Sequence, residues 1–138
     1  MATREATCYY RDRFNDDFAR TYFRGFAGTA VSSIGVGTYR GEATDEADER
    51  YLKALIDAVE SGINVIDTAR NYRHGRSEHV VGEAIRAAEI EREAILLCSK
   101  AGFVAFESER PADPAGYVRD RYIDTGLAAS NEIVKGNC

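Results

Sequence analysis

The apolar residues between positions 30 and 100 follow two patterns, helical spacing and short continuous runs, and these patterns predict the order of secondary structure. Two segments place apolar side chains three or four residues apart, as on one face of a helix. Short runs of β-branched and other apolar residues lie before, between and after them. The helical stripes consist of Tyr51, Leu52, Leu55, Ala58 and Val59 in the first segment and Val80, Val81, Ala84, Ile85 and Ala88 in the second. The pattern predicts strand, helix, strand, helix, strand.

Capping residues mark the ends of the two helices. Thr44 is the expected N-cap of the first helix, Gly62 its C-terminal stop, and Ser77 the N-cap of the second. The strands are expected at residues 34–38, 63–66 and 94–98. Because helices separate the strands, the fold class is α/β, with parallel strands joined by right-handed crossovers. The last strand should be buried on both faces.

The flanking segments are less regular. Residues 21–24 and 30–33 surround a glycine-containing turn and predict a β-hairpin. Residues 1–20 are charged and aromatic without a clear period, which predicts a poorly packed N-terminal arm. Residues 103–138 contain both prolines and no periodic element, so a long irregular segment is expected there. The predicted domain therefore covers residues 21–138.

Composition narrows the function classes. The chain has 138 residues and a net charge of −5, which argues against a nucleic-acid-binding or anionic-membrane surface. Its apolar runs are too short for a transmembrane helix, and its N-terminus lacks the apolar core of a signal peptide. Cys8, Cys98 and Cys138 are odd in number and widely spaced, which favours a reducing compartment and predicts a cytoplasmic protein. Cys98 is either a reactive thiol or, more commonly for a strand cysteine, an inert interior residue.

Three residues form a candidate proton-transfer group. Asp67 and Tyr72 are five residues apart, and Lys100 follows Tyr72 by 28 residues. A free phenol has a pKa of about 10, too high for an efficient acid at neutral pH. A neighbouring ammonium favours the phenolate and lowers that pKa, and a carboxylate can anchor the ammonium. These residue types together indicate acid catalysis by a tuned tyrosine.

The predicted topology brings these residues to one edge of the sheet. Thr38, Asp67 and Lys100 each lie at the carboxyl end of one of the three successive strands, and Tyr72 lies in the loop after the second. Functional groups of parallel α/β folds gather at the carboxyl ends of strands. An aspartate after a strand more often caps a turn, so the conjunction of all these positions carries the hypothesis.

Several motifs resemble a known family. They are Gly37-Thr38-Tyr39, Asp67-Thr68-Ala69-x-x-Tyr72, Gly75-x-Ser77-Glu78-x-x-x-Gly82 and Ser99-Lys100. From about Thr21 to Lys100 the chain is similar to the N-terminal half of an aldo-keto reductase, and the hairpin fits the one that closes the barrel floor in that family. The Asp-Thr-Ala-x-x-Tyr core with its lysine is the most specific of these matches.

The resemblance implies a (β/α)8 TIM barrel in which a nicotinamide cofactor, NADH or more usually NADPH, reduces aldehydes or ketones to alcohols. It makes Tyr72 the proton donor, Lys100 the neighbour that lowers the pKa of this tyrosine, and Asp67 the partner of Lys100. Gly37, Thr38 and Tyr39, together with Asp67, match the part of the site beside the nicotinamide. The expected partner is a small carbonyl substrate.

The chain departs from the family in length. A full barrel takes about 250 residues, and here three of the eight βα positions are recognised. The family's catalytic histidine and its basic cofactor-binding segment lie beyond them. We therefore expect an incomplete barrel with negligible carbonyl reduction by the isolated chain. The outer edges of its first and third strands are expected to be open to self-association. The alternatives are a non-catalytic barrel remnant that acts as an interaction or regulatory module, and an unrelated α/β domain that matches by chance.

Other candidate residues have simpler interpretations. His74 and His79 are expected to be polar residues of a loop and a helix. Gly35-x-Gly37 lacks the third glycine and the following helix of a dinucleotide-binding fingerprint. No metal site is predicted. Phe103 and Phe106 fit either the wall of an apolar pocket or packing of their own loop.

Overall fold

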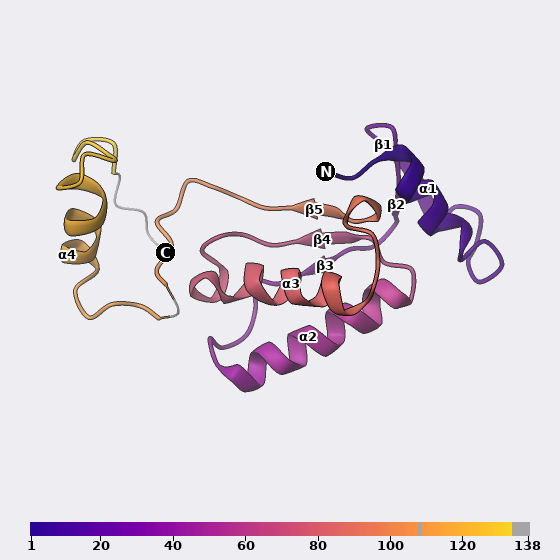
Figure 1. Cartoon of the computed structure of the whole chain (residues 1–138), viewed down its shortest axis with the longest axis horizontal. Coiled ribbons are helices and arrows are strands. Elements are labelled where there is room, and N and C mark those ends of the chain that lie inside the picture. The colour runs from indigo at the N-terminus through magenta and orange to yellow at the C-terminus, as the bar shows by residue number, and fades with distance from the viewer. Residues whose placement is uncertain (108, 134–138) are drawn as a thin grey trace. The chain divides into compact units, whose positions relative to one another are not determined.

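The computed structural model describes residues 1–107 and 109–133 (Figure 1). The chain forms two compact units, Met1–Ser108 and Glu109–Cys138. The first unit contains both sheets, three α-helices and every residue of the predicted site. The sequence pattern did not predict this division of the chain.

The second unit corrects part of the prediction of an irregular segment over residues 103–138, of which residues 108 and 134–138 lie outside the described part of the chain. It contains helix α4 (Pro114–Val118) and a π-helical turn over Arg119–Ile123. Asp113 caps α4, because its side chain accepts hydrogen bonds from the backbone N–H groups of the second and third residues after it, at 3.1 and 2.9 Å. Proline at the first helical position fits this start, where its missing N–H has no helical partner to lose. One helical turn is too short to show a period in the sequence.

A parallel sheet of three strands organises the first unit. Its order is β3 (Val36–Gly37), β4 (Val65–Asp67), β5 (Leu96–Cys98), with Gly37 opposite Asp67 and Asp67 opposite Cys98. The predicted βαβαβ order with parallel strands is therefore confirmed, although each strand is shorter than expected. Within the described residues, β3 and β5 each pair on one side only.

The last strand is less buried than predicted. Leu96 and Leu97 of β5 are half-buried, and Cys98 is an exposed free thiol. The prediction of a strand buried on both faces, and of Cys98 as an interior residue, was therefore wrong. The physical reason is that β5 has one neighbouring strand and no helix among the described residues that covers its outer side.

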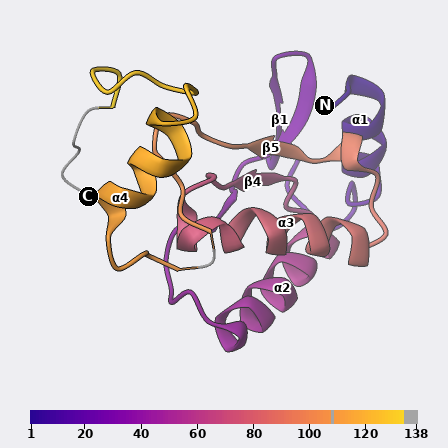
Figure 2. The same cartoon turned by 60° about the vertical axis from the view of Figure 1, so that its left-hand side comes forward.

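Helices α2 (Asp45–Glu60) and α3 (Arg76–Ala87) lie side by side on the same side of the sheet (Figures 1 and 2). The first begins as predicted, because the Thr44 hydroxyl accepts a hydrogen bond from Ala47 N–H at 3.3 Å. Gly62 follows the C-cap Ser61 as the predicted stop, and its φ of +93° is the left-handed conformation that favours glycine.

The start of α3 differs from the prediction. Gly75, with φ +89°, occupies the N-cap position, and Ser77 lies inside the first turn. Ser77 does not cap the helix; its buried hydroxyl donates a hydrogen bond to the Thr38 carbonyl at 2.8 Å. This bond ties α3 to the end of β3, a tertiary contact that resembles a helix cap in the sequence.

The predicted hairpin is present, shifted by up to two residues. Strands β1 (Phe23–Phe26) and β2 (Thr29–Ser32) pair in antiparallel register. The two residues between them, Ala27 and Gly28, both have positive φ, at 46° and 82°. Both values suit the two-residue turns that match strand twist.

Asn64 joins the hairpin to the parallel sheet. It lies just before β4 with 0% of its surface exposed. Its amide nitrogen donates to the carbonyls of Ala30 and Ala94, at 2.9 and 3.0 Å, and its side-chain oxygen accepts from Ser32 N–H at 2.8 Å. Asn64 therefore fixes the start of the strand that carries Asp67.

Residues 1–20 were predicted to form a poorly packed arm. This prediction was wrong for residues 4–12, which form a packed helix. Helix α1 (Arg4–Asp12) buries Ala6, Thr7 and Tyr10. The Thr7 hydroxyl accepts a hydrogen bond from Ala30 N–H of the hairpin at 3.1 Å. This buried face combines a small, a polar and an aromatic residue, so it shows no hydrophobic stripe in the sequence.

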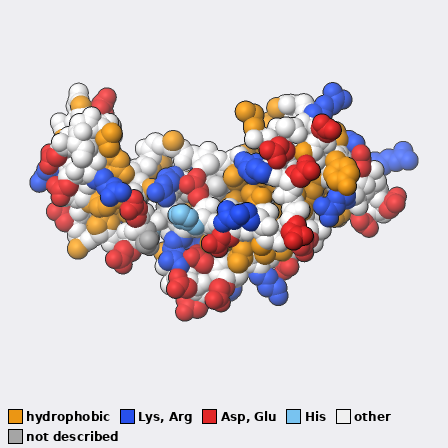
Figure 3. Space-filling model, viewed as in Figure 1, with side chains coloured by type: hydrophobic (Ala, Val, Ile, Leu, Met, Phe, Trp, Pro, Cys, Tyr) orange, Lys and Arg blue, Asp and Glu red, His pale blue; other side chains and the backbone are white. Residues whose placement is uncertain are grey.

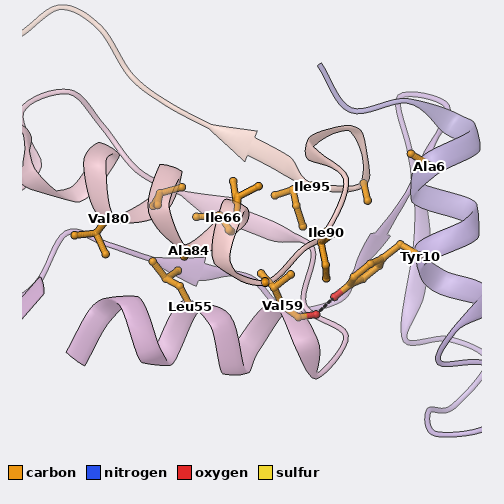
Figure 4. Close-up of a cluster of buried hydrophobic side chains, with 13 residues drawn as sticks. Ala6, Tyr10, Leu55, Val59, Ile66, Val80, Ala84, Ile90 and Ile95 are labelled. Atoms are coloured by element: carbon orange, nitrogen blue, oxygen red, sulfur yellow. Dashed lines mark hydrogen bonds between the residues drawn. The ribbon is translucent and has the colours of Figure 1, made fainter. Parts of the chain in front are cut away.

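The core lies between α2, α3 and the sheet and extends to α1 (Figure 4). Both predicted helical stripes contribute to it, since Leu55 and Val59 come from α2 and Val81 and Ala84 from α3. Tyr10 reaches the same cluster, and its hydroxyl donates a hydrogen bond to the Val59 carbonyl. Burial raises the pKa of the Tyr10 phenol above its ordinary value.

The raised pKa of Tyr10 predicts an alkaline loss of stability. The fold favours the neutral phenol, so its stabilisation is complete below the unfolded pKa of about 10 and is lost as pH rises from there through the folded pKa. We expect the free energy of unfolding to fall above about pH 10 in the wild type and to fall less steeply in Tyr10→Phe. At neutral pH the variant should be about 1 kcal/mol less stable, because it lacks the bond to Val59. Urea unfolding at several pH values measures this. The prediction is contradicted if the free energy of unfolding falls equally steeply with pH in the wild type and in Tyr10→Phe.

The surface of the chain is mixed in charge. Figure 3 shows acidic and basic side chains interspersed over the visible face. In the part of the chain that the structure describes, no helix combines the length and the apolar character needed to span a bilayer.

Candidate active site

The carboxyl ends of the three parallel strands bring the predicted catalytic residues together. Asp67 is the last residue of β4, and Lys100 follows the end of β5 by two residues. Tyr72 begins the 3-10 turn Tyr72–Gly75 that leads into α3. Convergence of the three side chains therefore follows from strand pairing and one tight turn.

Lys100 and Asp67 form an ion pair at this edge. The Lys100 Nζ donates to both Asp67 carboxylate oxygens at 2.7 Å and to the Thr68 carbonyl at 3.1 Å. The two side chains are 47% and 48% exposed, so the pair adds little to stability. Its main consequence is that the ammonium has a defined position.

The same ammonium lies over Tyr72. The Lys100 Nζ is 4.7 Å from the centre of the Tyr72 ring, and the Tyr39 ring meets Tyr72 edge to face at 5.0 Å between centroids. The Asp67 carboxylate, and after it the Tyr72 hydroxyl, raises the pKa of the Lys100 ammonium. Lys100 therefore stays charged beside the phenol at neutral pH.

The residues predicted beside the cofactor differ in their surroundings. Thr38 is buried, and its hydroxyl donates to Thr68 Oγ1 at 2.9 Å and lies 3.3 Å from the Asp67 carbonyl. Tyr39 is 65% exposed, and, apart from the two chain neighbours of Gly37, no described residue lies within 4 Å of the position that a Cβ on Gly37 would take. The Thr38 side chain thus supports the backbone of the site through buried hydrogen bonds, while Gly37 and Tyr39 lie at the surface.

One supporting contact has no counterpart in the sequence prediction. The Ser99 hydroxyl donates to the Glu78 carboxylate at 2.6 Å, which links the residue before Lys100 to α3. Glu78 and Ser99 both belong to the motifs that carry the family resemblance, but spacing alone does not show that they meet.

The remaining candidates are peripheral. His74 is half-buried, with its ring 6.4 Å from that of Phe106, and His79 is exposed. Phe106 therefore packs within its own unit against the turn after Tyr72, whereas Phe103 is largely exposed. Among the described residues, no three His, Cys, Asp or Glu side chains are grouped so that they could hold a metal ion.

The chain matches a family model and a curated protein. The model of the aldo/keto reductase family matches residues 33–138. The "Uncharacterized oxidoreductase YqkF" of Bacillus subtilis (strain 168) is 38% identical over 72 residues, which cover 52% of this chain and 22% of that protein. The chain thus spans about a fifth of the length of this curated relative. With the family model covering most of its residues, the chain belongs to the aldo/keto reductase family.

Proposed function

We propose that this chain supplies the proton-donating part of the active site of an NADPH-dependent carbonyl reductase, with Tyr72 as the acid. The observation that carries the proposal is the position of Lys100, which binds both oxygens of Asp67 and lies over the Tyr72 ring. Family membership and the name of the oxidoreductase relative support the reaction class. The substrate class proposed is small aldehydes and ketones.

Three residues take separate roles in the proposed proton transfer. Tyr72 donates its hydroxyl proton to the carbonyl oxygen, which becomes the alcohol oxygen. Lys100 stabilises the phenolate that remains, because a cation beside a phenolate lowers its free energy. Asp67 holds the ammonium in place through two hydrogen bonds. The phenolate then takes up a proton from solvent, which restores the neutral acid.

The open edge of the site fits the nicotinamide end of the cofactor. Gly37 leaves room for a flat ring, and the exposed ring of Tyr39 can pack against one. Asp67 is opposite Gly37 in the sheet, so the acid and the open edge are neighbours. When bound, NADPH would supply the hydride for the carbonyl carbon. We extend the proposal to a (β/α)8 barrel and to a cytoplasmic location, the latter on the free thiols of Cys8 and Cys98.

A second function has its own supporting observation. Within the described residues the outer edges of β3 and β5 are unpaired, and such edges offer backbone groups to another strand. A non-catalytic module that docks or self-associates through these edges is the alternative.

One experiment separates the two. The polypeptide encoded by the complete reading frame that contains residues 1–138 is assayed for NADPH oxidation with a simple aldehyde, and its mass in solution is measured. Aldehyde-dependent NADPH oxidation supports the reductase. The reductase proposal is refuted if NADPH neither binds nor is oxidised. If the polypeptide then also associates in a concentration-dependent way, the docking module is favoured.

A further inference from the structure

The backbone after Tyr72 has an unusual conformation. Arg73 and His74 both lie in the left-handed region, with φ of 50° and 58°, and Gly75 follows with φ 89°. Residues other than glycine rarely adopt this conformation, because Cβ then crowds the backbone. The local chain therefore does not favour this turn, and contacts from elsewhere must hold it.

Those contacts come from the Arg73 side chain, which is 1% exposed. Its Nε donates to the Glu42 carbonyl at 2.8 Å, and its Nη2 donates to the Asp48 carboxylate at 2.5 Å. The guanidinium also lies 4.8 Å from the centre of the Tyr51 ring. Nη1 has no hydrogen-bond partner among the described residues, so the Tyr51 ring is part of what compensates this buried charge.

These partners, and the Thr44 carbonyl at 3.5 Å from Nη2, all belong to one segment, residues 42–51, which joins β3 to α2 and forms the first turns of that helix. The Tyr51 hydroxyl donates in turn to the Arg40 carbonyl. The preceding residue, Tyr39, packs against the Tyr72 ring. Arg73 thus connects the loop after β3 with the turn that bears Tyr72, and it contacts neither Lys100 nor Asp67 in any described interaction.

We propose that Arg73 is a positioning residue that holds the Tyr72 ring against Lys100 by clamping its turn to residues 42–51. The proposal rests on the proposed function for its catalytic consequence, but the placement of Tyr72 can be measured without turnover.

The test is carried out on the 138-residue chain by NMR. Arg73→Gly removes the clamp and keeps a residue that tolerates positive φ. The readouts are the nuclear Overhauser contact between the Tyr72 ring and the Lys100 ε-methylene, and the pKa of Lys100 from its ε-carbon shift. In folded Arg73→Gly we expect the contact between Tyr72 and Lys100 to be lost. The pKa of Lys100 should fall part of the way back toward the ordinary value of lysine. Asp67→Asn removes the first contributor to the raised pKa and should lower it further.

Arg76→Ala is the matched control. Arg76 also pairs with Asp48, through Nε at 2.8 Å, but it has no described contact with Glu42 or Tyr51. This variant should keep both the ring contact and the Lys100 pKa. If Arg73→Gly fails to fold, Arg73→Lys decides, since it retains the charge but cannot reach two acceptors with a planar fork. A folded Arg73 variant with the wild-type contact and titration overturns the proposal.

The catalytic consequence is tested in the polypeptide from the complete reading frame. A misplaced acid should lower kcat about 10²-fold while KM for NADPH stays within a factor of about two. A wild type without carbonyl reduction would refute the proposed function and leave the NMR result standing. Wild-type kcat in Arg73→Gly would refute the positioning role alone.

Discussion

Replacing Tyr72 by phenylalanine is expected to lower kcat for carbonyl reduction by about 10²–10⁴-fold, the usual contribution of a positioned general acid. The variant keeps the ring that packs against Tyr39 and lies under Lys100. It loses only the hydroxyl, which is the proton source in the proposed reaction. The measurement is aldehyde-dependent NADPH oxidation by the polypeptide from the complete reading frame, at saturating concentrations of both substrates.

Tyr9→Phe provides the matched control. Tyr9 is 71% exposed on α1, so the same chemical change there should leave kcat within a factor of about two. A Tyr72→Phe variant that retains half of the wild-type kcat would rule out Tyr72 as the acid. An equal loss in both variants would show that the effect does not come from proton donation.

Asn64→Ala is expected to have the largest effect on stability. It removes three buried side-chain hydrogen bonds and leaves Ser32 N–H and the carbonyls of Ala30 and Ala94 without their partner. An unsatisfied buried polar group costs about 1–3 kcal/mol. We expect the free energy of unfolding to fall by about 3–5 kcal/mol, a large part of the stability of a small domain. Urea unfolding followed by circular dichroism measures the change.

Asn15→Ala is the control for this substitution. Asn15 is exposed and makes one long side-chain bond, 3.4 Å to Asp12, so its loss should change stability by about 0.5 kcal/mol or less. If Asn64→Ala lies within about 1 kcal/mol of the wild type, water or backbone movement must replace the lost bonds. In that case Asn64 would not be the residue that joins the hairpin to β4.

The local hydrophobic pattern was sufficient to predict the helices that bury one face against the sheet. The stripes that include Leu55 and Val81 specify α2 and α3, because helical periodicity records which side chains are buried. Alternation of these helices with short apolar runs also determines a parallel sheet, since parallel strands need crossovers. Asp67 ends one strand and Lys100 follows the adjacent one, so the sequence was sufficient to predict that the two side chains meet.

Polar contacts between distant segments could not be predicted in this way. Ser77 resembles an N-cap in the sequence, but its hydroxyl donates to the Thr38 carbonyl. Asn64 interrupts an apolar run, yet its side chain forms three hydrogen bonds with residues 30 or more positions away. Hydrogen-bond partners far apart along the chain leave no period, and each is specified only when the elements have packed. The same holds for α1, whose buried face contains Thr7 bonded to the hairpin.

The sequence by itself determined the parallel α/β order and the family, and it predicted the three residues that we propose as the proton-transfer group. Their chemistry is inherent in residue type, and their order along the chain places them at one sheet edge. The tertiary structure decided how that group is held. Arg73, in the left-handed turn after Tyr72, contacts residues 42–51, and we propose that these contacts hold the turn. The sequence pattern could not predict them, because the free energy that offsets an unfavourable backbone conformation comes from non-local bonds.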